Sequence, residues 1–314
     1  MSNSLDDQGL LDCLVIGGGP AGLAAALYLA RFKRRFLVVD SGKARALLIP
    51  ASHNIPFFAE GIAGPAILAR ERASAEHYGA RILDGTVTAL QKRPDAFVAV
   101  VDLVKDKPAR IQAKRVLLAT GAVDIEPDFP ELPNAVQRGL VRYCPICDGY
   151  EVTNRKIAVI GSDDRALGEA IFVARTYSRD VTLLTLGVKL TNDQRAQARE
   201  RCIEVIEEPI ASIDVEDNRI STMRLRSGKE QRFDVLYSAL GMKVRSDLAV
   251  ALAAQHNGGA LVVDPHNETT IKGLYAAGDV VHGLSQIVVG MGHAAIAATA
   301  IHNRCELPTE AEPQ

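Results

Sequence analysis

Two cysteines three positions apart, Cys144 and Cys147, are the residues of this sequence best suited to chemistry. Thiols separated by two residues can close a small disulfide, and a helix N-terminus or a neighbouring acid tunes which sulfur is the thiolate. Asp148 follows directly, and a carboxylate at this position can protonate one thiol while the other attacks. The segment predicts a redox-active dithiol/disulfide pair with an acid beside it.

Other interpretations of the same residues stay open at this point. A zinc half-site needs a second CxxC or a histidine pair at ligand spacing, whereas Cys202 and Cys305 stand alone, so we expect no metal. The two thiols could also be inert and buried, and Asp148 could serve only as a helix N-cap.

A glycine-rich turn lies near the N-terminus, where residues 17–22 read GGGPAG. It follows a short apolar strand at 13–16 and opens an Ala/Leu-rich helix at 23–31, and the next strand, 36–39, ends at an acid. In this context the glycines allow a tight turn, the close approach of a pyrophosphate to the backbone, and packing of the helix on the strand. The acid can accept hydrogen bonds from the ribose hydroxyls. We expect a dinucleotide site at Gly17, Gly19, Pro20, Ala21, Gly22 and Asp40.

The strand–turn–helix–strand pattern occurs twice. Its second copy has strands at 157–160 and 181–184 around a turn at 161–166 and a helix at 167–177. Between the two copies, residues 115–120 are expected to form a strand that closes the first half, and strand–turn returns are expected after the second copy at 233–241 and 273–279. This order predicts an α/β fold with two Rossmann-like, three-layer dinucleotide-binding domains, the second inserted in the first.

Composition excludes several classes of protein. The 314 residues include 36 basic and 38 acidic ones, so the net charge of −2 offers no footprint for nucleic acid or an anionic membrane. The apolar stretch 287–301 is interrupted by two glycines and a histidine and does not resemble a membrane span. Residues 1–8 are polar, so we expect no signal peptide. Five sparse cysteines argue against a structural disulfide framework, and we therefore expect a cytoplasmic location.

The order of these motifs resembles the low-molecular-weight thioredoxin reductase family over essentially the whole chain. GGGPAG is followed by ATG at 119–121, CPICDG at 144–149, a second βαβ turn and AAGD at 276–279. The resemblance implies an FAD-binding domain at 1–121 and 245–314, and an inserted domain at 122–244 that carries the cysteines. It also implies FAD as cofactor, a homodimer, and a thioredoxin-like protein or a small disulfide or dithiol as partner.

The resemblance also implies a role for each site residue. Cys147 faces the flavin and exchanges electrons with it, Cys144 attacks the partner disulfide, and Asp148 gives and takes the proton. The AAGD acid closes over the ribityl-phosphate part of the flavin, and the helix after it points its N-terminus at the flavin ring. The further expected FAD contacts are Asn54, Val87, Thr120, Gly121, Gly278, Asp279, Gln286 and Ile287.

The second βαβ turn departs from the family pattern. Asp163 stands where relatives that bind NADPH have a glycine, and its carboxylate would obstruct and repel a pyrophosphate. Relatives carry a His-Arg-Arg run for the ribose 2′-phosphate, but residues 185–187 here read Thr-Leu-Gly. Lys189 and Arg195 lie a few residues on and could contact some phosphate. We therefore expect either that NADPH binds in a modified arrangement or that the electrons come from a different donor.

Several alternatives remain for the electron route. A dithiol oxidase passes electrons from a small dithiol through the flavin to oxygen, and residues 40–45 (DSGKAR) with Ser52 and His53 look like those of such enzymes. A second group takes electrons from ferredoxin, and a third places a second FAD in the inserted domain. Outside enzymes, the chain could be a flavin redox sensor in which cysteine state controls partner binding without turnover.

Overall fold

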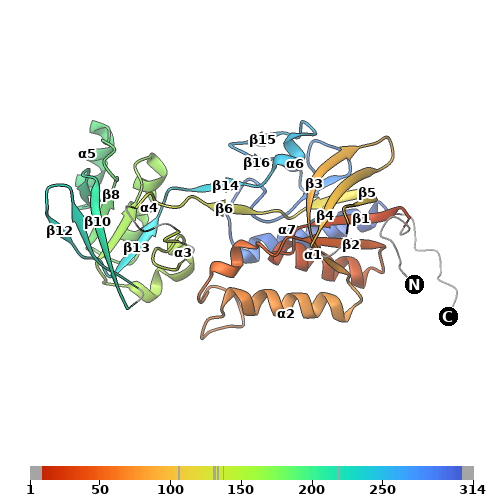
Figure 1. The fold of residues 1–314 in the computed structure, drawn as a ribbon, viewed down its shortest axis with the longest axis horizontal. Coiled ribbons are helices and arrows are strands. Elements are labelled where there is room, and N and C mark those ends of the chain that lie inside the picture. The colour runs from red at the N-terminus through yellow and green to blue at the C-terminus, as the bar shows by residue number, and fades with distance from the viewer. Residues whose placement is uncertain are drawn as a thin grey trace. The chain divides into compact units, whose positions relative to one another are not determined.

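The computed structural model describes residues 9–104, 107–129, 132, 134–136, 138–217 and 219–305. The chain forms two compact units, each a Rossmann-like α/β fold (Figure 1). The first unit contains Met1–Ile49, Ala63–Val123 and Val244–Gln314, and the second contains Asp124–Lys243 together with Pro50–Ile62. The sequence analysis had not separated Pro50–Ile62 from the first domain.

The first unit is built on a parallel sheet of apolar strands. β1 (Leu11–Ile16) lies between β2 (Phe36–Asp40) and β5 (Ala109–Leu118), and β17 (Leu274–Ala276) pairs with β5 on the far side. β3 (Ile82–Lys92) begins beside β2 in the same parallel direction. β1, β2 and β17 are buried along most of their length, which explains why they are mostly apolar.

Two long strands, β3 and β5, extend beyond the parallel sheet. Both pair antiparallel with β4 (Phe97–Leu103), so each belongs to the parallel sheet at one end and to a three-stranded layer at the other. A core that includes Leu14, Phe97 and Val116 joins these layers. The short elements α6 (Asp247–Val250), β15 (His256–Asn257) and β16 (Ala260–Leu261) belong to the same unit.

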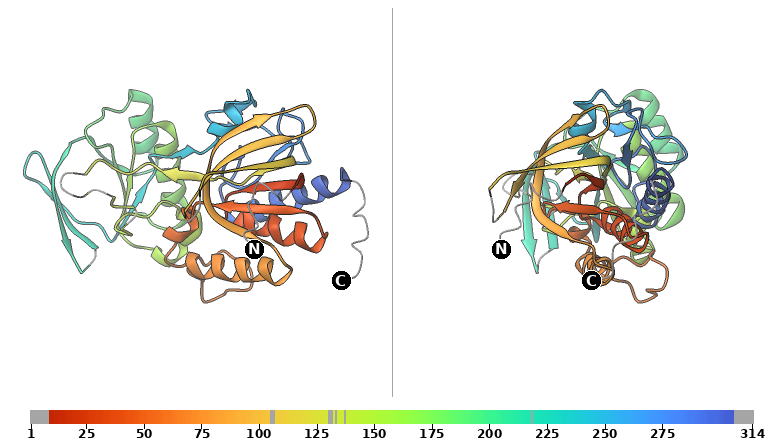
Figure 2. Two further views of the ribbon diagram at one scale, coloured as in Figure 1. Left: turned by 45° about the vertical axis from the view of Figure 1, so that its right-hand side comes forward. Right: turned by 90° about the vertical axis from the view of Figure 1, so that its right-hand side faces the viewer.

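Helices cover the other face of the parallel sheet. α1 (Pro20–Arg31) and α7 (Ile287–Asn303) pack side by side there, and α2 (Gly64–His77) packs on α1 (Figure 2). Their contacts are largely alanines that are fully buried, which lets the helices approach each other closely. α1 begins three residues earlier than predicted because Pro20 occupies its first turn, where a missing N–H costs nothing.

The second unit has a four-stranded parallel sheet in the order β13 (Val235–Ser238), β7 (Ile157–Ile160), β8 (Val181–Leu184) and β9 (Glu204–Ile206). One core joins this sheet to residues of α4 (Asp164–Thr176) and α5 (Asn192–Glu200). A second core joins it to an antiparallel sheet of β10 (Ile210–Glu216), β11 (Arg219–Leu225) and β12 (Glu230–Gln231). β7 and β8 have the predicted bounds.

Two of the chain's four passages between the units are made by neighbouring strands. β6 (Ala122–Asp124) and β14 (Met242–Val244) pair with each other. Backbone hydrogen bonds flank this pair, from Ile125 to Gly241 at 2.9 Å and from Arg245 to Gly121 at 2.9 Å. Within the described residues, no helix combines the length and apolar character that crossing a bilayer requires.

Candidate active site

Cys144 and Cys147 form a disulfide, with an S–S bond of 2.05 Å. Cys144 is the N-cap of the short helix α3 (Pro145–Asp148), and the backbone N–H of Cys147 donates to the carbonyl of Cys144 at 2.9 Å. Zinc ligation would need both sulfurs as thiolates, so the disulfide argues against a zinc half-site. No group of three or more histidine, cysteine or acidic side chains suited to a metal occurs in the part of the chain that the structure describes.

Asp148 is the last residue of α3 and caps no helix N-terminus. Cys144 caps α3, and Gly149 precedes the next helix, η3 (Tyr150–Val152), so the interpretation of Asp148 as only an N-cap is wrong. Its carboxylate is instead held by two side chains. Oδ2 accepts a hydrogen bond from Nη1 of Arg142 at 2.9 Å, and Oδ1 accepts one from the hydroxyl of Tyr237 at 2.8 Å.

The surroundings of Asp148 favour its protonated form. Burial raises the pKa of this carboxyl above its ordinary value, and the charge of Arg142 and the hydrogen bond from Tyr237 offset only part of that effect. Burial, together with the nearby Asp148 charge, also raises the pKa of Tyr237, which keeps its hydroxyl a donor. An acid with increased proton affinity next to a disulfide is suited to proton exchange with thiols.

Arg142 and Tyr237 meet because the segment before the cysteines adds itself to the edge of the sheet. The Arg142 N–H donates to Leu236 at 2.8 Å, and the Ser238 N–H donates to the Arg142 carbonyl at 2.7 Å. This short parallel bridge places residue 142 beside Tyr237 of β13. The sequence analysis missed both residues, since only the long-range pairing brings them to Asp148.

The segment Pro50–Ile62 lies against the redox loop. Nδ2 of Asn54 donates to the carbonyl of Ile146 at 3.4 Å, and Nδ1 of His53 lies 3.4 Å from Oε1 of Glu151. The segment is closed on itself by a bridge between Ser52 and Ile62. Asn54, expected at the FAD, thus contacts one of the two residues between the cysteines.

The first glycine turn has the shape that a dinucleotide site requires. Gly17 has φ +111°, and a Cβ there would lie 2.3 Å from the Ala119 carbonyl oxygen; a Cβ on Gly22 would lie 1.9 Å from the Gly17 oxygen. Gly19 differs, since its Cβ would meet nothing closer than 3.8 Å. Gly19 is the N-cap of α1 and makes no side-chain cap, so this helix N-terminus is open to an anion such as a pyrophosphate.

Asp40 stands at the end of β2, directly against this turn. Its Oδ1 accepts hydrogen bonds from the backbone N–H groups of Gly18 at 3.2 Å and Gly42 at 3.0 Å. Its Oδ2 pairs with Nη2 of Arg72 at 3.1 Å. The acid is therefore fixed where the βαβ pattern places a ribose ligand.

The late AAGD segment meets the glycine turn. A Cβ on Gly278, which has φ +79°, would lie 3.0 Å from the Cβ of Ala21. Asp279 pairs with Arg45 at 3.2 Å. α7 follows with Ile287 as its first residue and Gln286 as its N-cap. The structure thus brings Gly278 together with the 17–22 turn.

The remaining expected FAD contacts are placed differently. The hydroxyl of Thr120 donates to the carbonyl of Arg245 at 2.6 Å, so it joins the segment before β6 to the segment after β14. Gly121 has φ +68° and open space beside its Cα. The side chain of Val87 is buried in the core between the layers, so any contact of this residue with a ligand would have to come from its backbone.

The second βα turn carries its own carboxylate. Asp163 is the N-cap of α4, and its Oδ1 accepts a hydrogen bond from the Ala166 N–H at 2.9 Å. Its Oδ2 accepts another from Nη2 of Arg165 at 3.0 Å, and the same nitrogen donates to the Leu240 carbonyl at 3.1 Å. The N-terminus of α4, which would face a pyrophosphate, is therefore capped by a side chain of the protein itself.

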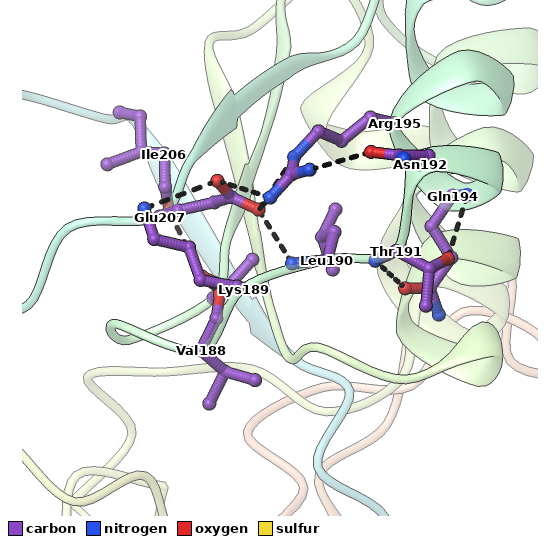
Figure 3. Close-up of polar contacts among 10 residues, drawn as sticks. Val188, Lys189, Leu190, Thr191, Asn192, Gln194, Arg195, Ile206 and Glu207 are labelled. Carbon is purple, nitrogen blue, oxygen red and sulfur yellow. Dashed lines mark hydrogen bonds and ion pairs between the residues drawn. The ribbon is translucent and has the colours of Figure 1, made fainter.

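The two cations that follow the second turn are also paired (Figure 3). Nη2 of Arg195 lies 2.9 Å from Oε1 of Glu207, and Nζ of Lys189 lies 3.5 Å from its Oε2. The Leu190 N–H donates to the same carboxylate at 2.6 Å and, with Arg195, lowers the pKa of Glu207. Lys189 and Arg195 were expected as possible phosphate contacts. Both instead pair with Glu207, which the sequence analysis had not identified.

Comparison with known proteins gives consistent matches. The family model described as pyridine nucleotide-disulphide oxidoreductase matches residues 11–299. A thioredoxin reductase of Streptomyces coelicolor is 31% identical over 96% of this chain and 92% of its own length. Among solved structures, HlmI superposes with a TM-score of 0.85 at 31% identity, over 96% of this chain and 94% of its own. Thioredoxin reductase from Streptococcus pyogenes superposes with a TM-score of 0.84 at 26% identity, over 95% of this chain and 98% of its own.

Proposed function

The chain belongs to the pyridine nucleotide-disulphide oxidoreductase family and is an FAD-dependent disulfide oxidoreductase, and from this we propose that electrons pass between FAD and the Cys144–Cys147 disulfide. The observation that carries the proposal is this disulfide, held at the start of a short helix beside a buried acid. We propose further that the electron donor is not NADPH bound in the family's usual place.

The first unit offers the residues that would hold FAD. The open N-terminus of α1 at Gly19 fits the pyrophosphate, and the fixed carboxylate of Asp40 fits a ribose. Gly278, Asp279 and the N-terminus of α7 would bind the ribityl and ring portions, as the resemblance implies. When bound, FAD would supply the redox centre that exchanges two electrons with the disulfide.

The cysteines would carry the electrons onward by thiol exchange. Reduction of the disulfide takes two electrons and two protons and yields two thiols, one of which Asp148 would protonate. The Cys144 thiolate would attack one sulfur of a partner disulfide, forming a mixed disulfide and releasing the partner's other sulfur as a thiol. Attack by Cys147 on that mixed disulfide restores Cys144–Cys147 and frees the second partner thiol. The similar proteins named thioredoxin reductase point to a thioredoxin-like partner.

The contrast between the two βα turns supports the proposal about the donor. α1 begins without a side-chain cap, whereas the N-terminus of α4 is capped by the Asp163 carboxylate. An NADPH pyrophosphate placed there would have to displace this carboxylate or meet its charge. Glu207 further balances the cations near the 2′-phosphate position. The matches give no support to a second FAD in this unit, and we do not propose one.

The test is an anaerobic titration of the purified protein with NADPH and NADH, read by flavin absorbance, with flavin counted after denaturation. We expect one FAD per chain and no rapid bleaching by either nucleotide. Separate additions of reduced ferredoxin and of dithiothreitol would then identify the class of donor. Rapid bleaching by NADPH would overturn the proposal about the donor, and absence of FAD would overturn the proposed electron route.

A further inference from the structure

We propose that Arg142 and Tyr237 are positioning residues for disulfide exchange, which hold the Asp148 carboxylate in place for proton transfer to and from the cysteine pair. This inference rests on the proposed function, in which Asp148 exchanges a proton with the thiols. Neither residue was visible as functional in the sequence, and neither belongs to the CPICDG motif.

The first argument is the division of the carboxylate between two donors. Oδ2 is bound by Arg142 and Oδ1 by Tyr237, at 2.9 and 2.8 Å, so both oxygens have fixed directions. The donors come from different parts of the unit, one from the edge segment before α3 and one from β13. An acid held on both sides is fixed in orientation, which proton transfer needs.

The second argument is that both donors are themselves immobilised. Tyr237 is fully buried in the parallel sheet, with an exposure of 0%. Arg142 has its backbone N–H and C=O bound to Leu236 and Ser238, so its main chain is an added strand residue. The loop after Asp148 is equally tight, because a Cβ on Gly149 would lie 2.2 Å from the ring of Tyr177.

The third argument concerns whether each neighbouring group raises or lowers the pKa of Asp148. Four ionisable groups act on Asp148 or are affected by its charge: Arg142, Tyr237, Glu151 and Tyr177. Arg142 and Tyr237 lower the pKa of Asp148, while burial and Glu151 raise it. Loss of either donor therefore raises the pKa of Asp148 further, and the carboxylate form that accepts a thiol proton appears only at higher pH.

This arrangement predicts a simple chemical consequence. When a thiol of the reduced pair attacks, its proton passes to the Asp148 carboxylate, and when the pair is reduced again the same proton returns to the departing thiolate. Without Arg142 or the Tyr237 hydroxyl, the carboxylate holds that proton more tightly and releases it less readily.

The test uses the pH dependence of thiol reactivity, which does not require turnover. The holoprotein is reduced with dithiothreitol, freed of reductant under nitrogen and alkylated with iodoacetamide from pH 5 to 10, with each cysteine followed by mass spectrometry. In the wild type we expect an inflection from Asp148 that disappears in Asp148→Asn. In Arg142→Gln and Tyr237→Phe the inflection should move upward by at least about half a pH unit, and Arg142→Lys should largely restore it.

Matched controls are Arg232→Gln, an arginine with 75% side-chain exposure in the same unit, and Tyr78→Phe, an exposed tyrosine at the C-cap of α2. Both should follow the wild-type curve, and flavin absorbance and circular dichroism confirm folding of every variant. Wild-type curves for Arg142→Gln and Tyr237→Phe, alongside an altered Asp148→Asn, would overturn the positioning role. An unchanged Asp148→Asn curve would instead overturn the role of Asp148 in the proposed function.

Discussion

The carboxylate of Asp163 accepts a hydrogen bond of 2.9 Å from the backbone N–H of Ala166, so the N-terminus of α4 is closed by a residue of the same turn. In the first unit the equivalent position is Gly19, whose helix has no side-chain cap. Two turns of similar sequence spacing thus differ at the point where an anion would bind.

Removal of this cap should cost stability. We expect Asp163→Ala to lower the free energy of unfolding by about 1 kcal/mol, whereas Asp163→Asn, which retains an accepting oxygen, should cost much less. Urea unfolding followed by circular dichroism measures the difference, with flavin content as a check on the first unit. Equal stability of the alanine and asparagine variants would show that the hydrogen bond contributes little.

Gly19 offers a test of the FAD site that leaves the protein itself undisturbed. Its φ of −75° suits any residue, and an added Cβ would have its nearest neighbour at 3.8 Å, so Gly19→Ala should fold normally. If a pyrophosphate approaches this backbone, the methyl group will weaken FAD binding at least about tenfold, or about 1.4 kcal/mol.

The comparison variant is Gly168→Ala in α4, where an added Cβ would meet nothing within 4 Å. Flavin retained after gel filtration and the dissociation constant of the stripped protein are the measurements. Full FAD binding by Gly19→Ala would place the pyrophosphate elsewhere.

Glu71 should make the stability of the protein depend on pH. It lies on α2 one turn from the buried Ile67 and Ala75, and neither carboxylate oxygen has a hydrogen-bond partner among the described residues. Burial raises its pKa from 4.5 to about 8. Between these values the unfolded chain loses the proton first, so the folded state is progressively destabilised as pH rises, and above about 8 the penalty is constant.

Glu71→Gln should therefore be more stable than the wild type by an amount that grows from pH 5 to 8, reaching on the order of 3 kcal/mol. Thermal unfolding at a series of pH values measures this gain. Glu76→Gln, at a half-exposed position on the same helix, is the control for the substitution itself. A pH-independent gain for Glu71→Gln would contradict ionisation of a buried carboxyl.

The parts of the fold that depend on local pattern were predictable. β7 and β8 have the expected bounds because each is a short apolar run between turn residues, and α7 begins at Ile287, next to the predicted Gln286. α4 begins at Asp164, three residues earlier than expected, because its cap is the Asp163 side chain. The same aspartate that departs from the family's glycine pattern sets the start of the helix.

The network around Asp148 was not predictable, for a physical reason. Tyr237 lies 89 positions away in sequence and reaches the acid only through the pairing of residue 142 with β13. In the sequence, Tyr237 is one apolar strand residue among several, and Arg142 is one charge near a turn. Glu207 was missed for the same reason, since its contact with Arg195 depends on how β9 leads away from the sheet.

The most direct test of the central claim follows electrons from the flavin to the cysteines within one molecule. The holoprotein is photoreduced anaerobically until the flavin has taken up two electrons, and the light is then switched off. We predict that the flavin absorbance returns in the dark while two thiols appear on Cys144 and Cys147, and that Cys147→Ser stays reduced. A wild-type flavin that remains reduced beside an intact disulfide would contradict the account.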